Sequence, residues 1–559
     1  MVKRLLKLNL EKLLLDNDKI PYSKFKLLLS EQKSTGKNLI RLILEKNLMS
    51  YEEISSIIES YFGIKHVDIK NIKSLDKSLA KYVPEIWAKK YGSVPIRIDG
   101  SSITLAMSDP LNTAAINEIK FTSGYDIVPV MAPYQDIEYL ICKIYNSTAK
   151  IEISESSFKN MSFAGDNPEL EAVTNAPAVG LVNSIILQAV KSGASDIHIE
   201  PFESYIRVRL RIDGLLQEIM RLSKESHPEV ISRIKIIANL DIAEKRMPKD
   251  GRVVINVDGK PVDLRLSIVP TIFGEKVVIR LLNRADFLKS KSELGFDSKD
   301  LKKIESMIRL PHGVILITGP TGSGKSTTLY AFLNELNTLE KNIITIEDPV
   351  EYTMQGINQI NVNTKIGLTF AEGLRCILRQ DPDVIMIGEI RDKETARIAI
   401  SAAITGHLVL STLHTNDAPS SPDRLIDMGI QPFLVSSSLI GVIAQRLVRK
   451  ICSFCKYQYE ANEYEKKLLG LNSSSIIKLY RGRGCEKCNY TGYRSQIAVY
   501  EIMEFTQEHK RSIIQNGCGC EIKDISLKNG MKTLMESCTD LVINGVTTVD
   551  ELIRKTLMS

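Results

Sequence analysis

Short apolar runs separated by helical stretches fill the second half of the chain. Val314–Thr318 and Ile343–Glu347 are almost wholly apolar, and a similar run follows Asp383. Uninterrupted runs of this length are typical of strands that are buried on both faces of a parallel sheet. Thr327–Leu333 follows the first run and has a helical pattern. The pattern predicts an α/β domain over residues 309–450.

Residues 176–285 instead alternate polar and apolar positions. In Tyr205–Asp213 every second residue is apolar, and arginines occupy the positions between them at Arg207, Arg209 and Arg211. Alternation with a period of two places these three side chains on one face of a strand. Cations gathered on one face need an anion to meet them. Either acids lie opposite on the same sheet, or the arginines reach a nucleotide bound to a neighbouring domain or subunit.

The N-terminal residues have a helical pattern with an internal repeat. Leu13–Tyr22 maps onto Leu42–Tyr51 at a spacing of 29 residues. Ser50 and Glu53 form a capping box at the start of a helix. Two copies indicate a pair of helical hairpins, because a solenoid needs three or more repeats.

Gly319–Ser326 has the spacing of a phosphate-binding loop, between a predicted strand and a predicted helix. The glycines let successive N–H groups point at phosphate oxygens, Lys325 neutralises phosphate charge, and the Ser326 hydroxyl can bind Mg²⁺. The predicted nucleotide-binding residues are Gly319, Pro320, Thr321, Gly322, Ser323, Gly324, Lys325, Ser326 and Thr327. The loop predicts a nucleotide-driven protein that uses ATP and magnesium.

Two acids and a histidine follow later apolar runs. Glu347 and Glu389 fall at the carboxyl ends of predicted strands, where ligands bind in open parallel sheets. We assign Glu347 to activation of the attacking water and Glu389 to the magnesium side, although the two roles can be exchanged. His414 also follows a strand and is the candidate sensor of the γ-phosphate, whereas His407 precedes that strand and is interpreted as structural.

Four of the nine cysteines form two pairs, Cys452 with Cys455 and Cys485 with Cys488. Two pairs of this spacing supply four thiolates for a tetrahedral zinc ion. Four sulfur ligands leave no open coordination position. The sequence therefore predicts a structural zinc site and not a catalytic one.

The predicted fold class is multidomain α/β. The order is an N-terminal regulatory or docking domain (1–150, helical over 1–65 and α/β over 66–150), a polar linker (151–175), a second N-terminal domain (176–285), a charged helical linker (286–308), and a P-loop ATPase domain (309–559) that carries the zinc element (452–488) and a helical C-terminal region.

Composition narrows the class of protein. The 559 residues are 43% hydrophobic and 25% charged, with a net charge of +6 and one Trp. Polar residues interrupt the longest apolar run, at 178–190, so no segment reaches the roughly 20 residues of a membrane span. The charged N-terminus argues against a signal peptide. We expect a cytoplasmic protein held at a membrane by a partner, without the basic aromatic stripe of a nucleic-acid motor.

These motifs, in this order, resemble the secretion ATPase superfamily, in particular its type II secretion and type IV pilus assembly branch (GspE/PulE/PilB type). The matching segments are a Walker A box (Gly319–Tyr330), an Asp box (Ile346–Glu351), a Walker B box (Leu378–Asp392), a His box (Thr405–Asp417) and, in the second domain, Gly193–Pro201, Arg211–Gly214 and Thr271–Lys276. The resemblance covers essentially the whole chain. The tetracysteine element is typical of this branch.

The resemblance implies a PAS-like second domain and a RecA-like ATPase core. It also implies a homohexameric ring that uses ATP to rotate an inner-membrane platform protein, which then inserts or extracts pilin subunits. Arg209 and Arg211 match arginines that reach the nucleotide from the second N-terminal domain. Relatives that bind cyclic di-GMP begin each N-terminal repeat with Arg-Leu-Gly, whereas Lys7–Asn9 and Asn38–Ile40 stand here. This departure argues against cyclic di-GMP binding.

Several functions are compatible with the motifs. The extended N-terminal region favours pilus assembly, whereas Pro432–Gly441 is more similar to the type II secretion branch. A nucleic-acid motor and a nucleotide-sensing scaffold without turnover are alternatives from other classes. An intact set of Glu347, Glu389 and His414 argues against the scaffold.

Overall fold

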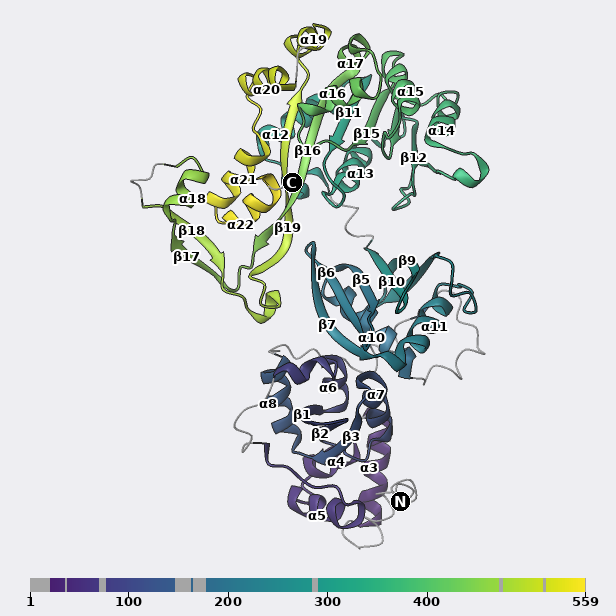
Figure 1. Cartoon of the computed structure of the whole chain (residues 1–559), viewed down its shortest axis with the longest axis vertical. Coiled ribbons are helices and arrows are strands. Elements are labelled where there is room, and N and C mark those ends of the chain that lie inside the picture. Colours follow the sequence, from purple (N-terminus) through teal and green to yellow (C-terminus); the bar gives the residue numbers. More distant parts are fainter. Residues whose placement is uncertain are drawn as a thin grey trace. The chain divides into compact units, whose positions relative to one another are not determined.

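The computed structural model describes residues 21–35, 38–69, 77–145, 162–163, 177–283, 290–471, 476–515 and 519–557. The chain divides into two compact units, Met1–Leu282 and Asn283–Ser559 (Figure 1). The first residues of the predicted repeat and most of the predicted linker 151–175 lie outside the described residues. None of the described helices combines the length and the apolarity that crossing a bilayer requires.

The described part of the first unit begins with three amphipathic helices, α3 (Tyr22–Thr35), α4 (Leu39–Glu45) and α5 (Tyr51–Phe62). Their apolar faces pack into one cluster that includes Phe25 and Ile58. Both hydrogen bonds of the predicted capping box at the start of α5 are present. The helical prediction is confirmed for the described part of this region.

An α/β layer follows the three helices. Its elements are α6 (Glu85–Tyr91), β1 (Ser93–Asp99), β2 (Ser102–Met107), α7 (Thr113–Ser123), β3 (Asp126–Met131) and α8 (Tyr134–Tyr145). The sheet has the order β1-β2-β3, with β1 antiparallel and β3 parallel to β2.

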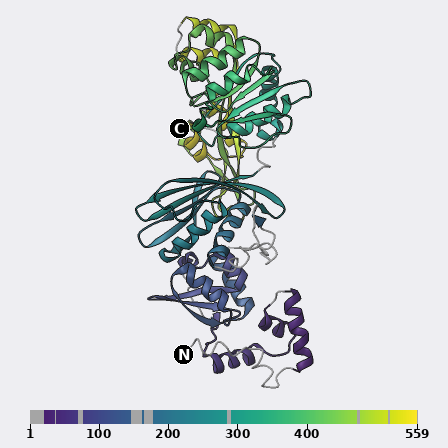
Figure 2. The same cartoon turned by 90° about the vertical axis from the view of Figure 1, so that its right-hand side faces the viewer.

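A seven-stranded sheet forms the rest of the first unit, in the order β4-β8-β9-β10-β5-β6-β7. Its elements are β4 (Ser162–Phe163), α10 (Pro177–Lys191), β5 (Ala194–Pro201), β6 (Tyr205–Ile212), β7 (Leu215–Ser223), α11 (His227–Ile237), β8 (Lys249–Val257), β9 (Lys260–Thr271) and β10 (Gly274–Asn283). Helices α10 and α11 pack together on this sheet (Figures 1 and 2).

Two features of this unit differ from the predicted domain limits. Apolar residues from 69–144 and from 181–279 belong to one continuous core, so the two α/β parts form a single compact body. The predicted linker 151–175 contains β4, which pairs with β8. The reason is that Ser162 and Phe163 complete the edge of the sheet by backbone hydrogen bonds, which composition does not reveal.

The second unit is built on another seven-stranded sheet, in the order β13-β12-β14-β15-β11-β16-β19, parallel except for the β16–β19 pair. Its elements are β11 (Gly313–Thr318), α13 (Lys325–Leu336), β12 (Ile343–Glu347), β13 (Asn358–Asn361), α14 (Phe370–Ile377), β14 (Val384–Ile387), α15 (Lys393–Ile404), β15 (Leu408–Leu413), α16 (Ser420–Asp427), α17 (Pro432–Ser438), β16 (Leu439–Ile451) and β19 (Tyr493–Glu504).

Helices cover both faces of this sheet. Alternate residues of each central strand join one of two apolar cores, one with α13 and the other with α14 and α15. Burial on both faces explains why the strands are uninterrupted apolar runs. The predicted α/β fold class is confirmed.

Helix α12 (Ser298–Ile308) corrects the predicted linker 286–308. Its apolar residues Ile304, Met307 and Ile308 are buried in the core that also holds β11 and α13. Its charged face suggested a solvated connection, but one apolar stripe is enough to dock a helix.

Beyond β16, a small two-stranded sheet of β17 (Lys456–Glu460) and β18 (Lys478–Gly482) precedes β19. Helices α19 (Gln507–Ile514), α20 (Gly519–Lys528), α21 (Leu534–Ile543) and α22 (Val549–Leu552) follow β19, and a π-helical turn (Ile553–Leu557) ends the described chain.

Candidate functional site

The phosphate loop connects a buried strand to a helix, as predicted. All six residues of β11 are buried, and α13 begins at Lys325. A Cβ atom on Gly319 would lie 2.5 Å from the carbonyl oxygen of Gln445, and one on Gly324 would lie 2.8 Å from Nε2 of Gln445. Both glycines also have positive φ angles, of 146° and 89°. Glycine is therefore favoured at both ends of the loop by backbone conformation, and at Gly319 also by the space beside the backbone of Gln445.

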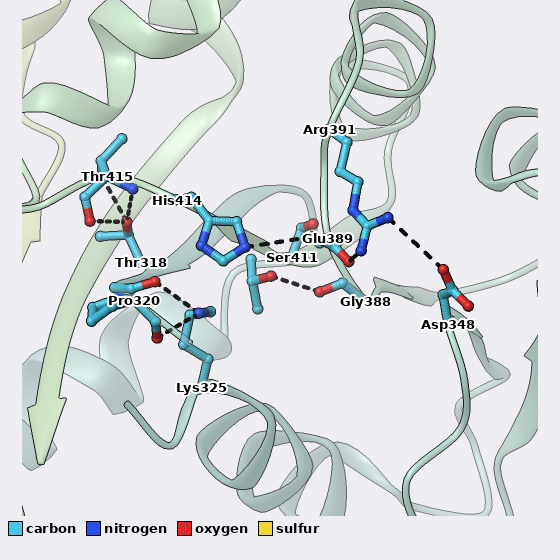
Figure 3. Close-up of polar contacts among 12 residues, drawn as sticks. Thr318, Pro320, Lys325, Asp348, Gly388, Glu389, Arg391, Ser411, His414 and Thr415 are labelled. Carbon is cyan, nitrogen blue, oxygen red and sulfur yellow. Dashed lines mark hydrogen bonds and ion pairs between the residues drawn. The ribbon is translucent and has the colours of Figure 1, made fainter. Parts of the chain in front are cut away.

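The loop has groups that suit an anion. The Lys325 ammonium donates to the carbonyl oxygens of Gly319 and Pro320 at 2.7 and 3.0 Å (Figure 3). Burial, together with the charge of Arg446, lowers the pKa of Lys325 to about 8, although Glu389 opposes the shift. The buried Oγ atom of Ser323 has no hydrogen-bond partner in the described structure. A phosphate group would satisfy this hydroxyl and compensate the lysine charge.

Glu389 and His414 lie together beside the loop. Glu389 follows β14, and His414 follows β15, and Nε2 of His414 is 3.5 Å from Oε2 of Glu389 (Figure 3). Arg391 pairs with Glu389 and lies 3.9 Å from Asp348, so it bridges the two acidic segments. The carboxyl ends of neighbouring parallel strands bring these residues to one edge of the sheet.

Glu347 is placed differently from Glu389. It ends β12 but is only 4% exposed, and Tyr330 and Thr345 donate to its carboxylate at 2.5 and 2.6 Å. Gln359 donates a third hydrogen bond at 3.2 Å. In this structure the Glu389 side chain, at 18% exposure, is the more accessible of the two carboxylates.

Two further polar residues named from the sequence, Ser326 and His407, lie near this site. Ser326 lies exposed in the first turn of α13, so its hydroxyl is accessible to magnesium, and an oxygen set of hydroxyl, carboxylate and phosphate suits that ion. His407 is bound to the backbone, with Nδ1 2.8 Å from the carbonyl oxygen of Ala402. Its interpretation as a structural histidine is confirmed.

Sequence reasoning missed Tyr330 and Arg391 as members of the site. Tyr330 is fully buried on α13 and resembles an ordinary core residue until its hydroxyl is seen on Glu347. Arg391 follows Glu389 by two residues, and this proximity to a candidate carboxylate was the available signal.

The arginine face of β6 meets acids of the neighbouring strand β5. Glu200 is 3.1 Å from Arg207 and 2.8 Å from Arg209, and Asp196 is 3.4 Å from Arg211. Burial raises the pKa of Glu200, but Arg209, Lys276 and Arg207 outweigh burial and lower that pKa to about 2. The alternative with acids opposite on the same sheet therefore describes this structure. A role of Arg209 and Arg211 at the nucleotide stays a prediction.

Four thiols meet where β16 ends and where the segment before β19 turns. The Sγ atoms of Cys452, Cys455, Cys485 and Cys488 all lie within 4.8 Å of one another. Three of the pairs are 3.8 Å apart. A tetrahedral zinc ion with Zn–S bonds of about 2.3 Å places its sulfur ligands about 3.8 Å apart. The donor set and its spacing fit zinc.

Backbone groups prepare one of these thiols for deprotonation. The N–H groups of Cys485 and Gly492 donate to Sγ of Cys488 at 3.2 and 3.3 Å. Burial raises the pKa of Cys488, but these N–H groups and the neighbouring thiols outweigh burial and lower that pKa below its ordinary value. Such hydrogen bonds also orient a thiolate toward a metal.

A family model described as "Type II/IV secretion system protein" matches residues 171–554. The chain belongs to the type II/IV secretion system protein family. This family membership, with the phosphate loop and the acids around it, identifies the chain as an ATPase.

Similar proteins come from both branches of this family. The type IV pilus assembly ATPase PilB of Myxococcus xanthus is 41% identical over 543 residues, which cover 94% of this chain and 95% of that protein. The type II secretion system protein E of Pseudomonas aeruginosa is 43% identical over 484 residues, which cover 85% of this chain and 96% of that protein. Among solved structures, the Legionella pneumophila ATPase DotB has a TM-score of 0.51 at 20% identity and covers 68% of this chain and 96% of DotB, a likeness of fold.

A second family model corrects one expectation. Residues 62–150 match the MshEN domain, a class of domain that binds cyclic di-GMP. The expectation that the chain does not bind cyclic di-GMP is therefore not supported. Residues 7–9 and 38–40, which suggested it, lie before the matched segment.

Proposed function

We propose that this secretion-family ATPase powers type IV pilus assembly. The observation that supports this choice is the extent of the similarity. The pilus assembly relative aligns with 94% of the chain, whereas the secretion relative aligns with 85%. The type II secretion ATPase is the second candidate, since 43% identity over that shorter alignment is equally high.

The site suggests how hydrolysis proceeds. ATP phosphates replace the carbonyl oxygens of Gly319 and Pro320 as partners of Lys325, and the N-terminus of α13 faces them. Ser326 would hold magnesium beside the phosphates, with Glu389 on the same side, and the ion would supply positive charge to the leaving phosphates. His414, which is 3.5 Å from Glu389, contacts the γ-phosphate and responds to its loss.

Glu347 takes the role of water activation in this proposal. Its carboxylate is bound to the Tyr330 hydroxyl at 2.5 Å, so it must exchange that partner for water before it can accept a proton. Arg209 and Arg211 complete the site when the second N-terminal domain of the same or a neighbouring subunit closes on the nucleotide. To do so, they exchange part of their pairing with Glu200 and Asp196 for phosphate oxygens.

The assembled machine is proposed to be a cytoplasmic homohexamer at the inner membrane. It works with a platform protein and with other pilus or secretion components, and zinc stabilises the element at 452–488. The proposed domain order is the one that the sequence predicts, with a PAS-like second domain and a RecA-like ATPase core. Parts of 151–175 and 286–308, which were predicted as linkers, join the folded units.

Deletion of the gene and complementation separate the two candidates. Loss of surface pili in electron micrographs, restored by the wild-type gene and not by a Lys325→Ala gene, supports pilus assembly. If pili persist and secreted enzymes disappear from the medium, type II secretion is the function. Light scattering of the purified chain with ATP checks the hexamer of 62.6-kDa subunits.

Cyclic di-GMP is a candidate ligand of the segment that matches the MshEN domain. Calorimetric titration of the full chain with cyclic di-GMP tests it, with cyclic di-AMP as the control for nucleotide specificity. Saturable heat with the first nucleotide alone supports regulation through this domain.

A further inference from the structure

Arg446 is a buried cation behind the phosphate loop. It lies on β16 and is only 2% exposed. Nη2 donates to the carbonyl oxygen of Asn416 at 2.7 Å, and Nη1 donates to that of Gln445 at 3.1 Å. The buried Nε atom has no hydrogen-bond partner in the described structure.

The charge of Arg446 is not balanced by a neighbouring acid. Across the described ranges, no carboxylate is within ion-pair distance of its guanidinium, and Glu501 and Asp417 act on it only from further away. Arg449, three residues along the same strand, is by contrast 2.7 Å from Glu551. A buried charge without a counterion is costly, and burial accordingly lowers the pKa of Arg446.

The guanidinium of Arg446 lies against the phosphate loop and also bonds to the segment that follows His414. A Cβ atom on Gly319 would lie 3.1 Å from Nη1 of Arg446, so the guanidinium lies directly against the first residue of the phosphate loop. Its other partner, Asn416, is two residues after His414. Arg446 therefore contacts the phosphate loop and, through the carbonyl oxygen of Asn416, holds the segment that carries His414.

A pair of threonines strengthens this connection. The N–H group of Thr415 donates to Oγ1 of Thr318 at 2.8 Å, and the two hydroxyls are 2.6 Å apart (Figure 3). Thr318 directly precedes the phosphate loop, and Thr415 directly follows His414. The phosphate loop and the histidine segment are thus joined by the threonine pair and, through Asn416, by Arg446.

We propose that Arg446 is a positioning residue for ATP hydrolysis, which acts in two ways. Its charge is compensated when ATP phosphates enter the loop, and this compensation contributes to nucleotide affinity. Its hydrogen bond to Asn416 holds His414 at the distance from the loop that turnover requires. The inference rests on the proposed ATPase function, and no direct contact with the phosphates is needed because the charge acts across the loop.

Arg446→Met tests the charge. Replacement of an unpaired buried ion by an apolar side chain of similar length is often neutral or stabilising, so the Tm of the nucleotide-free full chain is expected to stay the same or rise. Affinity for a fluorescent ATP analogue with Mg²⁺ is expected to fall roughly tenfold, the scale of one charge acting across several ångströms of protein. The increase in Tm on adding ATP should shrink correspondingly.

Arg446→Lys separates the two roles. Lysine keeps the charge but lacks the planar fork that reaches two carbonyl oxygens. ATP affinity is expected to stay near that of the wild type, while kcat falls because the His414 segment is less firmly held. Lys450→Met is the matched control, since Lys450 is an exposed cation on the same strand; it should leave affinity, kcat and Tm unchanged.

Three outcomes would overturn the proposal. A purely structural arginine would lower the Tm of the nucleotide-free Met variant while the folded fraction keeps wild-type affinity and kcat. Equal affinity losses in the Met and Lys variants would exclude the charge effect. Wild-type kcat in the Lys variant would exclude positioning of His414. If the folded wild-type chain itself neither binds nor hydrolyses ATP, the proposed function fails first; if it does both and Arg446 variants are silent, only this inference fails.

Discussion

The hydroxyl of Tyr330 donates a hydrogen bond of 2.5 Å to Oε2 of Glu347. Tyr330 lies on the helix that follows the phosphate loop, and Glu347 ends β12, the next strand along the chain. The nucleotide-binding helix therefore holds the carboxylate that is assigned to water activation. If Glu347 activates the water as proposed, we expect this hydrogen bond to open or shift during hydrolysis, because it occupies the carboxylate.

Glu347→Gln should bind ATP but hydrolyse it about 10²–10⁴-fold more slowly, the loss that follows removal of a general base. Tyr330→Phe should keep turnover, since it frees the carboxylate without removing it. Phosphate release assays at saturating ATP measure both variants. Normal turnover by Glu347→Gln together with a large loss in Glu389→Gln would mean that the two glutamates have the opposite roles.

Lys325→Ala should abolish turnover and leave the domain folded. Among the described residues, the ammonium donates only to the loop carbonyl oxygens of Gly319 and Pro320, so its loss removes a phosphate countercharge and no core packing. Circular dichroism and phosphate release check the two halves of this prediction. Lys341→Ala, at an exposed position after α13, is the control. Substantial hydrolysis by the folded Lys325 variant would refute the phosphate-loop assignment.

ATP affinity should depend on pH through Lys325. Its pKa of about 8 in the nucleotide-free chain means that binding of phosphate above pH 8 requires uptake of a proton. Affinity should therefore be level below pH 8 and fall above it, by up to about tenfold per pH unit. Titrations with the fluorescent ATP analogue from pH 7 to pH 9.5 measure the slope. Lys325→Arg stays charged throughout, so any binding that it retains should lack this slope.

The same group affects stability in the opposite direction. Burial lowers the Lys325 pKa from 10.5 in an exposed lysine to about 8, so between these values the unfolded chain binds a proton that the folded chain has lost. The contribution of Lys325 to the free energy of unfolding therefore rises with pH across this window. Below about pH 8 its contribution no longer changes.

Each chain should hold one zinc ion in the tetracysteine element. Replacing Cys485 and Cys488 by Ser is expected to reduce the zinc found by elemental analysis to zero and to lower Tm, because a structural metal contributes directly to folding. ATP hydrolysis should change less than stability does. Cys376→Ser, at an exposed thiol outside the cluster, is the control and should keep the metal. An active, purified wild-type chain without zinc would contradict this prediction.

Mixed rings test whether the arginines act across a subunit boundary. Arg211→Ala and Glu347→Gln chains should each be slow, because one lacks charge stabilisation of the transferred phosphate and the other lacks the base. If arginine and glutamate meet between subunits, a mixture contains some intact sites and regains activity. Subunit exchange is confirmed with differently labelled chains. No recovery after confirmed exchange would restrict Arg211 to its own subunit or to its bond with Asp196.

Much of the ATPase core could be predicted because its signals are local. The residues of β11, the glycines after it and the first turn of α13 are contiguous, and each has a steric or electrostatic reason for its residue type. The clustering of the four cysteines could also be predicted, because two pairs of this spacing are typical of a metal site. The strand face formed by Arg207, Arg209 and Arg211 was also predicted correctly from alternation.

The remaining parts depend on contacts between distant residues. Glu200 and Asp196 meet the arginines only because β5 pairs with β6 in a particular register. Tyr330 and Arg446 acquire their roles from neighbours 17 and 30 residues away. Strand β4 and helix α12 were assigned to linkers because edge pairing and a narrow apolar stripe leave little trace in composition.

Strand β16 also has a mechanical consequence. It begins beside β11, passes Gln445 and Arg446 behind the phosphate loop, and reaches Ile451 immediately before Cys452. Hydrogen bonds to β11 over its first half and to β19 over most of its length keep it extended, with a shift in register between Arg449 and Ile451. We therefore expect a movement at the phosphate loop to reach the four cysteines through this strand. Zinc held by these cysteines would fix the far end of the strand, and a chain without the metal would lose that fixed point.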